Sequence, residues 1–208
     1  MLIFSRQNLA YFAVPKTGST AVELALKPKA DIIFAKGRKH TPLMRFDAKI
    51  APFLDDAFDL RPERVAVIRD PVEQLSSWYR YRTQAALRGS DNSTAHLSFD
   101  QFIADVISDD PPPHAGVGSQ FRFLTASTGE VLVHRLFAYE RQPAFRGFLE
   151  ERFEQALDFK SKNVSPQTDT PLEPATRTKL RAARAAEFAL YDRLMAADGM
   201  LTFTPGAS

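Results

Sequence analysis

The chain of 208 residues contains no cysteine and only four histidines. The absence of cysteine excludes disulfide scaffolds, thiolate metal sites, thiol catalysis and iron–sulfur clusters. No two histidines lie close together in the sequence, so a zinc site is not expected. No apolar run approaches the roughly 18 residues of a bilayer-spanning helix, and the N-terminus lacks the basic and apolar regions of a signal peptide. We therefore expect a protein of the reducing cytoplasm, without a metal and without a membrane span.

Charge is nearly balanced, with 27 Lys and Arg against 25 Asp and Glu and a net charge of +2. This small excess does not favour a nucleic-acid partner. The hydrophobic fraction of 44% is typical of a globular protein. We expect residues 1–208 to form a single domain, because two domains in a chain of this length would each be small.

Short apolar runs alternate with amphipathic segments along the chain. The patterns predict strands over 9–14, 31–35, 64–68, 129–134 and 136–140, and helices over 20–26, 46–53, 71–87, 98–107, 144–156 and 174–197. Strands that alternate with helices indicate an α/β fold with a central, mainly parallel sheet flanked by helices.

A candidate anion site, Val14-Pro-Lys-Thr-Gly-Ser-Thr20, lies between a predicted strand and a predicted helix. Gly18 permits a tight turn, and the backbone amides that follow it would face a ligand at the positive end of the helix. The hydroxyls of Ser19 and Thr20 add donors, and Lys16 adds a mobile charge. The lysine precedes the glycine, so the segment differs from the nucleotide P-loop G-x-x-x-x-G-K-[ST]. The alternative is a plain strand–turn–helix with incidental Ser and Thr.

A second candidate, Arg69-Asp-Pro-Val-Glu-Gln-Leu-Ser-Ser-Trp-Tyr79, directly follows the next buried strand. Ligands bind at the C-terminal ends of strands in open α/β sheets. The Arg69 guanidinium can grip a phosphate there by two parallel hydrogen bonds, and Ser77 can add a hydroxyl. The alternative is an ion pair between Arg69 and Asp70 or another carboxylate. Together the two motifs suit a nucleotide that carries phosphates on both the 5′ and the 3′ side of one ribose.

Both motifs resemble those of the sulfotransferases that use 3′-phosphoadenosine 5′-phosphosulfate (PAPS). The chain is similar to the small bacterial members and to the carbohydrate branch that includes heparan sulfate 2-O-sulfotransferase. Pro15-Lys-Thr-Gly-Ser-Thr20 matches the 5′-phosphosulfate loop, and Arg69 with Ser77 matches the 3′-phosphate motif. Gln74 stands where many carbohydrate members carry arginine, which we expect to weaken only a helix-surface ion pair. Weaker likeness continues through Phe99-Asp-Gln-Phe, Gly118-Ser-Gln-Phe, Leu136-Phe-Ala-Tyr-Glu140, Asn163-Val-Ser165 and Glu187-Phe-Ala-Leu-Tyr191.

The resemblance implies a P-loop-like, three-layer fold and an enzyme that moves a sulfuryl group from PAPS to a hydroxyl or amine. The acceptor would be a small molecule or a carbohydrate, selected by loops within 36–46, 82–97 and 108–119. Lys16 would stabilise charge on the departing 5′-phosphate oxygen. The remaining donor contacts would come from the loop (Thr17, Gly18, Ser19, Thr20) and from the second motif (Arg69, Ser77).

His40 is the candidate base for the acceptor, because an imidazole is largely neutral at physiological pH. In the heparan sulfate 2-O branch a histidine at the corresponding place acts as the base, although that branch carries two histidines and Arg38 replaces the first one here. The alternative is a solvated histidine in a basic loop. Two other functions stay open: a small-molecule kinase on a divergent P-loop, and a nucleotide-binding module without catalysis.

Overall fold

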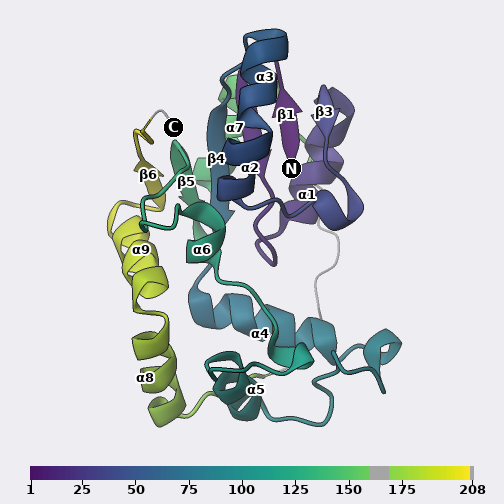
Figure 1. Cartoon of the computed structure of the whole chain (residues 1–208), viewed down its shortest axis with the longest axis vertical. Helices are drawn as coiled ribbons and strands as arrows, with labels where there is room; N and C mark the ends of the chain where they lie inside the picture. The colour runs from purple at the N-terminus through teal and green to yellow at the C-terminus, as the bar shows by residue number, and fades with distance from the viewer. Residues whose placement is uncertain (160–168, 207–208) are drawn as a thin grey trace.

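A six-stranded mixed sheet with the order β3-β1-β2-β4-β5-β6 forms the centre of the computed structural model, which describes residues 1–159 and 169–206 (Figure 1). The strands are β1 (Leu2–Phe4), β2 (Leu9–Phe12), β3 (Ile32–Ile33), β4 (Glu63–Ile68), β5 (Arg135–Ala138) and β6 (Met200–Thr202). The α-helices are α1 (Ser19–Leu26), α2 (Leu43–Lys49), α3 (Ala51–Phe58), α4 (Pro71–Arg82), α5 (Phe99–Val106), α6 (Gln120–Leu124), α7 (Gln142–Phe153), α8 (Pro174–Ala183) and α9 (Ala185–Ala196). The expectation of an α/β fold is confirmed.

The expectation of a central, mainly parallel sheet is confirmed only in part, because the centre of the sheet is parallel and its outer strands are antiparallel. β2 pairs with β4 and β4 with β5 in parallel, whereas β1 pairs with β2, β1 with β3 and β5 with β6 in antiparallel fashion. The two strands β1 and β2 are joined by a short turn in which Asn8 takes a φ of 45°, and a connection of this length permits only antiparallel pairing. Both motifs nevertheless follow strands of the parallel part of the sheet, one after β2 and the other after β4.

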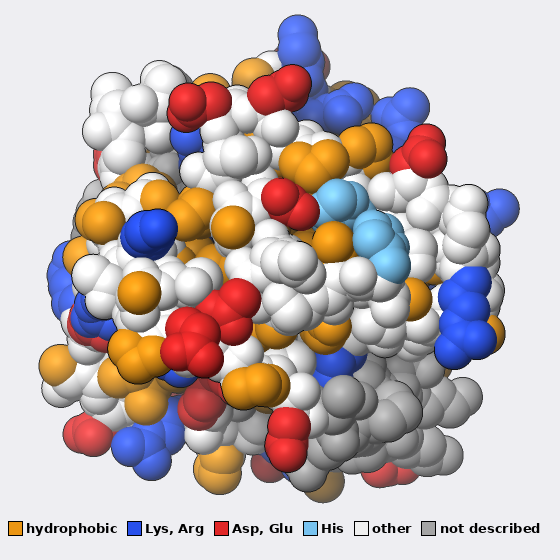
Figure 2. Space-filling model, turned by 90° about the horizontal axis from the view of Figure 1, so that it is seen from below, with side chains coloured by type: hydrophobic (Ala, Val, Ile, Leu, Met, Phe, Trp, Pro, Cys, Tyr) orange, Lys and Arg blue, Asp and Glu red, His pale blue; other side chains and the backbone are white. Residues whose placement is uncertain are grey.

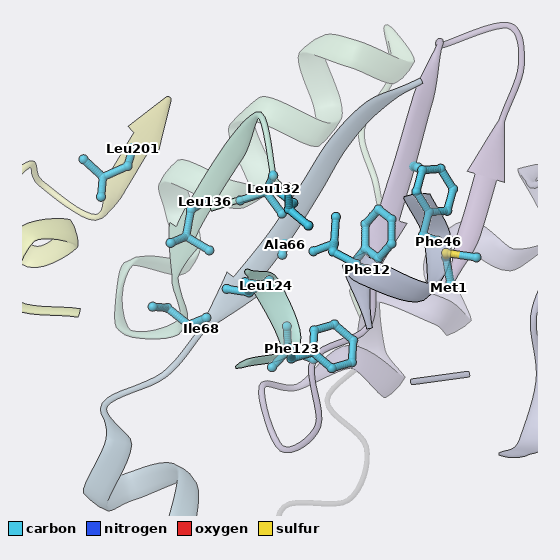
Figure 3. Close-up of a cluster of buried hydrophobic side chains, with 14 of the residues drawn as sticks. Met1, Phe12, Phe46, Ala66, Ile68, Phe123, Leu124, Leu132, Leu136 and Leu201 are labelled. Carbon is cyan, nitrogen blue, oxygen red and sulfur yellow. The ribbon is translucent and has the colours of Figure 1, made fainter. Parts of the chain in front are cut away.

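The four inner strands β1, β2, β4 and β5 bury side chains on both faces of the sheet, because successive side chains along a strand point to opposite faces. On one face Phe12, Ala66 and Leu136 belong to a buried cluster with residues of α2, α3, α6 and α9 (Figure 3). On the other face Tyr11 and Phe137 belong to a second cluster with residues of α1 and α7. Helices therefore cover both faces of the sheet and give the protein three layers.

A third buried cluster lies beyond the edge of the sheet, where the chain leaves β4 and enters α4. It joins α4, α5 and α8 through Leu75, Phe102 and Leu180, and Figure 1 shows these three helices below the sheet. α4 is thus anchored from below and keeps its upper side toward the ends of the parallel strands. No helix within residues 1–159 and 169–206 has the length and apolar character to cross a membrane.

Several predicted boundaries are wrong. The helix predicted over 46–53 is two helices, because Pro52 starts a new one at α3. The helix predicted to reach residue 87 ends at Arg82, and the one predicted over 174–197 breaks at Arg184, whose φ of −117° and ψ of 33° are not helical. Residues 129–134 form one isolated bridge, Thr125 with Val131, and no strand. Leu132 and Val133 are buried in the core cluster and Val131 packs against it, without a ladder of backbone hydrogen bonds.

Candidate anion-binding site

The ends of β2, β4 and β5 place three chain segments at one edge of the sheet, because these strands run parallel. The loop after β2 carries Lys16 and Gly18, Arg69 follows β4, and Tyr139 follows β5. The segments are in contact. A Cβ atom on Gly18 would lie 2.9 Å from Cε2 of Tyr139, and the Arg69 guanidinium carbon lies 4.8 Å from the centre of the same tyrosine ring. The structure therefore brings the two sequence motifs together.

The loop before α1 leaves the start of this helix without a side-chain cap. Gly18 occupies the N-cap position with a left-handed φ of 72°, and Lys16 takes a φ of 67°. The Thr17 hydroxyl donates 2.9 Å to the carbonyl oxygen of Val14 and so stabilises the turn from within. No acidic residue lies in the first turn of α1. Its first backbone amides and its positive dipole end are therefore suited to an external anion.

The two hydroxyl residues that follow Gly18 differ in their surroundings. Ser19 is buried, whereas Thr20 is half-buried. Lys39 Nζ lies 3.5 Å from the Thr20 hydroxyl and 2.8 Å from a carboxylate oxygen of Glu23. Lys39 of the basic loop therefore forms an ion pair with Glu23 of α1, whereas Lys36 and Arg38 are exposed.

Lys16 rests on aromatic rings. Its Nζ lies 4.5 Å from the ring centre of Tyr81 and 5.6 Å from that of Trp78, and Trp78 packs in edge-to-face contact with Tyr81. Burial, followed by the positive charges of Arg69 and Arg80, lowers the pKa of Lys16 to about 8. Within the described chain no carboxylate forms an ion pair with Lys16. Its charge is thus desolvated and uncompensated, as expected of a group that binds an anion.

The second motif is organised by Asp70, which caps α4. Its Oδ1 accepts hydrogen bonds of 2.9 Å from the backbone amides of Val72 and Glu73. Arg69 instead donates to the exposed carboxylate of Glu73 at 3.1 Å. The guanidinium therefore has a surface partner that water can replace, and Asp70 is not available to it. Ser77 lies on α4 and is 9% exposed.

Gln120 fixes the backbone of Arg69. Its Oε1 accepts from the Arg69 amide and its Nε2 donates to the Arg69 carbonyl oxygen, both at 2.9 Å. Glu187, which is 2% exposed, accepts from the backbone and the side-chain amide of Gln120 at 3.2 Å and from the Ser119 hydroxyl at 2.6 Å. Arg184 lies 3.5 Å from the Glu187 carboxylate. Three residues of this network, Ser119, Gln120 and Glu187, stand in the two segments of weaker likeness that begin at Gly118 and Glu187.

Gln74 is not a surface residue, so the expectation of a weakened helix-surface ion pair is wrong. It is 1% exposed, and its Nε2 donates 3.3 Å to the carbonyl oxygen of Pro15. Helix α4 thereby touches the loop that carries Lys16 through a direct side-chain bond. At this position a glutamine joins the two motifs to each other.

His40 lies in the loop after β3 and contacts the backbone just beyond the end of β2. Its Nδ1 is 2.6 Å from the carbonyl oxygen of Ala13. A carbonyl oxygen only accepts, so Nδ1 carries the hydrogen and the lone pair of the neutral ring is on Nε2. Desolvation outweighs this hydrogen bond and lowers the pKa of His40, with a further contribution from the charge of Lys39. The ring is thus neutral and oriented, although in the described residues no hydrogen bond links it to Lys16 or Arg69.

A cavity of about 560 Å³ lies away from the two motifs. Its lining residues lie within 88–96 and at Pro113 and His114, in two of the loops expected to select the acceptor. The rings of His96 and His114 are 6.1 Å apart, and Figure 2 shows two neighbouring histidines on the lower face. His114 Nε2 lies 2.6 Å from Asp105. No cluster of three or more His, Asp or Glu residues suited to a metal occurs in the part of the chain that the structure describes.

Comparison of the chain with protein-family models, with curated proteins and with solved structures finds no match. The class of protein is therefore defined by the fold and the site alone. It is a three-layer α/β protein in which lysine and arginine side chains gather where parallel strands end and two helices begin. Of the residues predicted for the site, Lys16, Gly18 and Arg69 share neighbours. Ser77 lies on α4. Sequence analysis missed Arg80, Tyr81 and Tyr139.

Proposed function

We propose that this protein belongs to the PAPS-dependent sulfotransferases and has a P-loop-like fold. It would transfer a sulfuryl group from PAPS to a hydroxyl or amine of a small-molecule or carbohydrate acceptor. The observation that carries the proposal is the excess of positive charge at the edge of the parallel strands. Arg69 and Arg80 both lie within electrostatic reach of Lys16, and of these three only Arg69 has a carboxylate partner in the described residues.

An anion of several charges would relieve this excess. The uncapped start of α1, with Lys16, would hold the 5′ group, because helix N-termini favour phosphate and sulfate. Arg69 and Ser77 would hold the 3′-phosphate at the start of α4. Residues 160–168, Lys-Ser-Lys-Asn-Val-Ser-Pro-Gln-Thr, contain no acidic side chain and so supply no competing carboxylate.

The proposed chemistry is an in-line displacement at sulfur. The acceptor oxygen or nitrogen forms a bond to sulfur while the bond from sulfur to the 5′-phosphate oxygen breaks and leaves its electron pair on that oxygen. The ammonium of Lys16 stabilises this new charge. The acceptor proton passes to Nε2 of His40, which the bond from Nδ1 to Ala13 leaves free to accept it.

Calorimetric titration with adenosine 3′,5′-bisphosphate, the product of the donor, tests the proposal, with ATP and Mg²⁺ as the comparison. We expect the bisphosphate to bind and ATP with Mg²⁺ to bind far more weakly. Preference for ATP with Mg²⁺ would overturn the proposal and favour a kinase. In turnover with PAPS and a panel of sugar and phenol acceptors, Lys16→Ala should abolish activity without unfolding the protein. Bisphosphate binding without turnover of any acceptor would favour a non-catalytic module.

A further inference from the structure

Arg80 is a half-buried cation on α4 whose function the two motifs leave unexplained. Its Nη1 lies 2.5 Å from the hydroxyl of Ser76, which in turn lies 2.7 Å from the hydroxyl of Thr170. The side chain therefore folds back along α4, as long helical side chains do, over the turn that contains Ser77. The hydroxyl of Ser76 holds the guanidinium in place without neutralising its charge.

The hydrogen-bonding capacity of Arg80 is only partly used. Its Nε is buried and has no partner among the described residues, and the same is true of the Nε of Arg69. In residues 1–159 and 169–206 no carboxylate forms an ion pair with Arg80, and the sequence of residues 160–168 contains no Asp or Glu. A buried donor without an acceptor destabilises the folded state, and an unpaired charge does so more strongly.

Arg80 and Arg69 also act on the same neighbour. Both guanidinium charges lower the pKa of Lys16, so both lie within electrostatic reach of it. A phosphate has three acceptor oxygens, enough for two arginines and a hydroxyl. Two partly satisfied guanidinium groups on either side of Ser77 in the sequence have the composition of a phosphate clamp.

We propose that Arg80 is a ligand of the 3′-phosphate and forms, with Arg69 and Ser77, the clamp that selects a nucleotide phosphorylated on both sides of the ribose. The inference deepens the proposed function and rests on it. A nucleotide with the 5′-phosphate alone engages Lys16 and the start of α1 but leaves Arg80 without its anion. The contribution of Arg80 to affinity therefore depends on the 3′-phosphate.

The test compares two ligands across three variants by calorimetry. The ligands are adenosine 3′,5′-bisphosphate and 5′-AMP, which differ only in the 3′-phosphate, and the variants are Arg80→Ala, Arg80→Lys and Arg88→Ala. Arg88 is exposed in the loop that follows α4. Arg88→Ala removes one positive charge, as Arg80→Ala does, and therefore controls for long-range electrostatics. We expect Arg80→Ala to weaken bisphosphate binding roughly 10- to 100-fold, the effect of a lost charge-assisted hydrogen bond.

The same Arg80→Ala variant should change binding of 5′-AMP less than about threefold, close to the effect of Arg88→Ala. Arg80→Lys should keep the charge but lose the planar fork, and should fall between the unaltered protein and Arg80→Ala. Equal losses for both ligands, or no loss for either, would overturn the role of Arg80 even if the unaltered protein binds the bisphosphate. If the unaltered protein does not prefer the bisphosphate over 5′-AMP, the proposed function fails first. Thermal unfolding without ligand verifies that each variant is folded.

Discussion

Lys16 should make nucleotide binding depend on pH in a range where arginine does not titrate. Its pKa is lowered to about 8 by burial and by the charges of Arg69 and Arg80. A bound phosphate brings negative charge next to the ammonium and raises the pKa again. Binding therefore takes up a fraction of a proton that grows toward one as the pH rises through 8, and affinity must fall as the pH rises.

The size of the effect follows from the fraction of charged Lys16. With a pKa of about 8, about 90% of the side chain is protonated at pH 7 and about 10% at pH 9, so affinity for adenosine 3′,5′-bisphosphate should fall about tenfold, or about 1.4 kcal/mol. Other groups contribute little in this window. The second ionisation of the phosphates, with a pKa near 6, is nearly complete by pH 7. The pKa of the Met1 amino group is lowered to about 6, and the pKa of His40 is also lowered.

Calorimetry in buffers of different ionisation enthalpy measures both the affinity and the protons taken up. We expect the unaltered protein to take up about half a proton on binding at pH 8, since half of Lys16 is then neutral. Lys16→Arg should bind with almost constant affinity from pH 7 to 9, because its charge persists. Lys16→Ala should bind more weakly and take up no proton. Constant affinity of the unaltered protein over this range, or proton uptake that persists in Lys16→Ala, would refute the reasoning.

Three further substitutions test the surroundings of Lys16. Gly18→Ala should lower the free energy of unfolding by about 1–3 kcal/mol, because the φ of 72° at Gly18 and the ring of Tyr139 at 2.9 Å both oppose a Cβ atom. Urea titration measures this change, and unchanged stability would contradict the geometry. Glu187→Gln should cost about 2–4 kcal/mol by leaving the half-buried Arg184 without a counter-charge. Equal stability of the two proteins in the same titration would show that the network is not needed. His40→Asn keeps an N–H donor for the carbonyl oxygen of Ala13. We expect turnover to fall at least about 100-fold while bisphosphate affinity, measured by calorimetry, stays within about twofold. A loss of affinity instead would assign His40 to binding.

The parts of the fold that depend on local sequence could be predicted. The run of buried residues before Pro15, the left-handed Gly18 and the following helix all arise from neighbours in the chain, and the strand–loop–helix is where the motif places it. The short strands β1 and β6 have three residues each and give too short a pattern for a strand prediction. They are stabilised by partners elsewhere in the sequence, which a pattern of apolar residues does not reveal.

Two of the missed site residues, Arg80 and Tyr81, depend on the rotation of α4. Sequence periodicity predicts α4 but does not say which side of it faces the loop after β2. The bond from Gln74 to Pro15 fixes that side and so turns Trp78 and Tyr81 toward Lys16. Arg80 is brought near the same loop by the same rotation, although nothing in the sequence distinguishes it from the other arginines.

The rings beneath Lys16 explain how an uncompensated charge can be kept ready for a ligand. A carboxylate partner would neutralise the ammonium, and an incoming phosphate would have to displace it. The face of an aromatic ring attracts a cation by only about 0.5–2 kcal/mol, so Tyr81 and Trp78 position Lys16 without occupying its charge. The lowered pKa of Lys16 is the remaining cost. Between pH 8 and the usual pKa of lysine, Lys16 is protonated to a smaller extent in the folded protein than in the unfolded chain. Phosphate binding removes that cost, and stability released in this way adds to affinity.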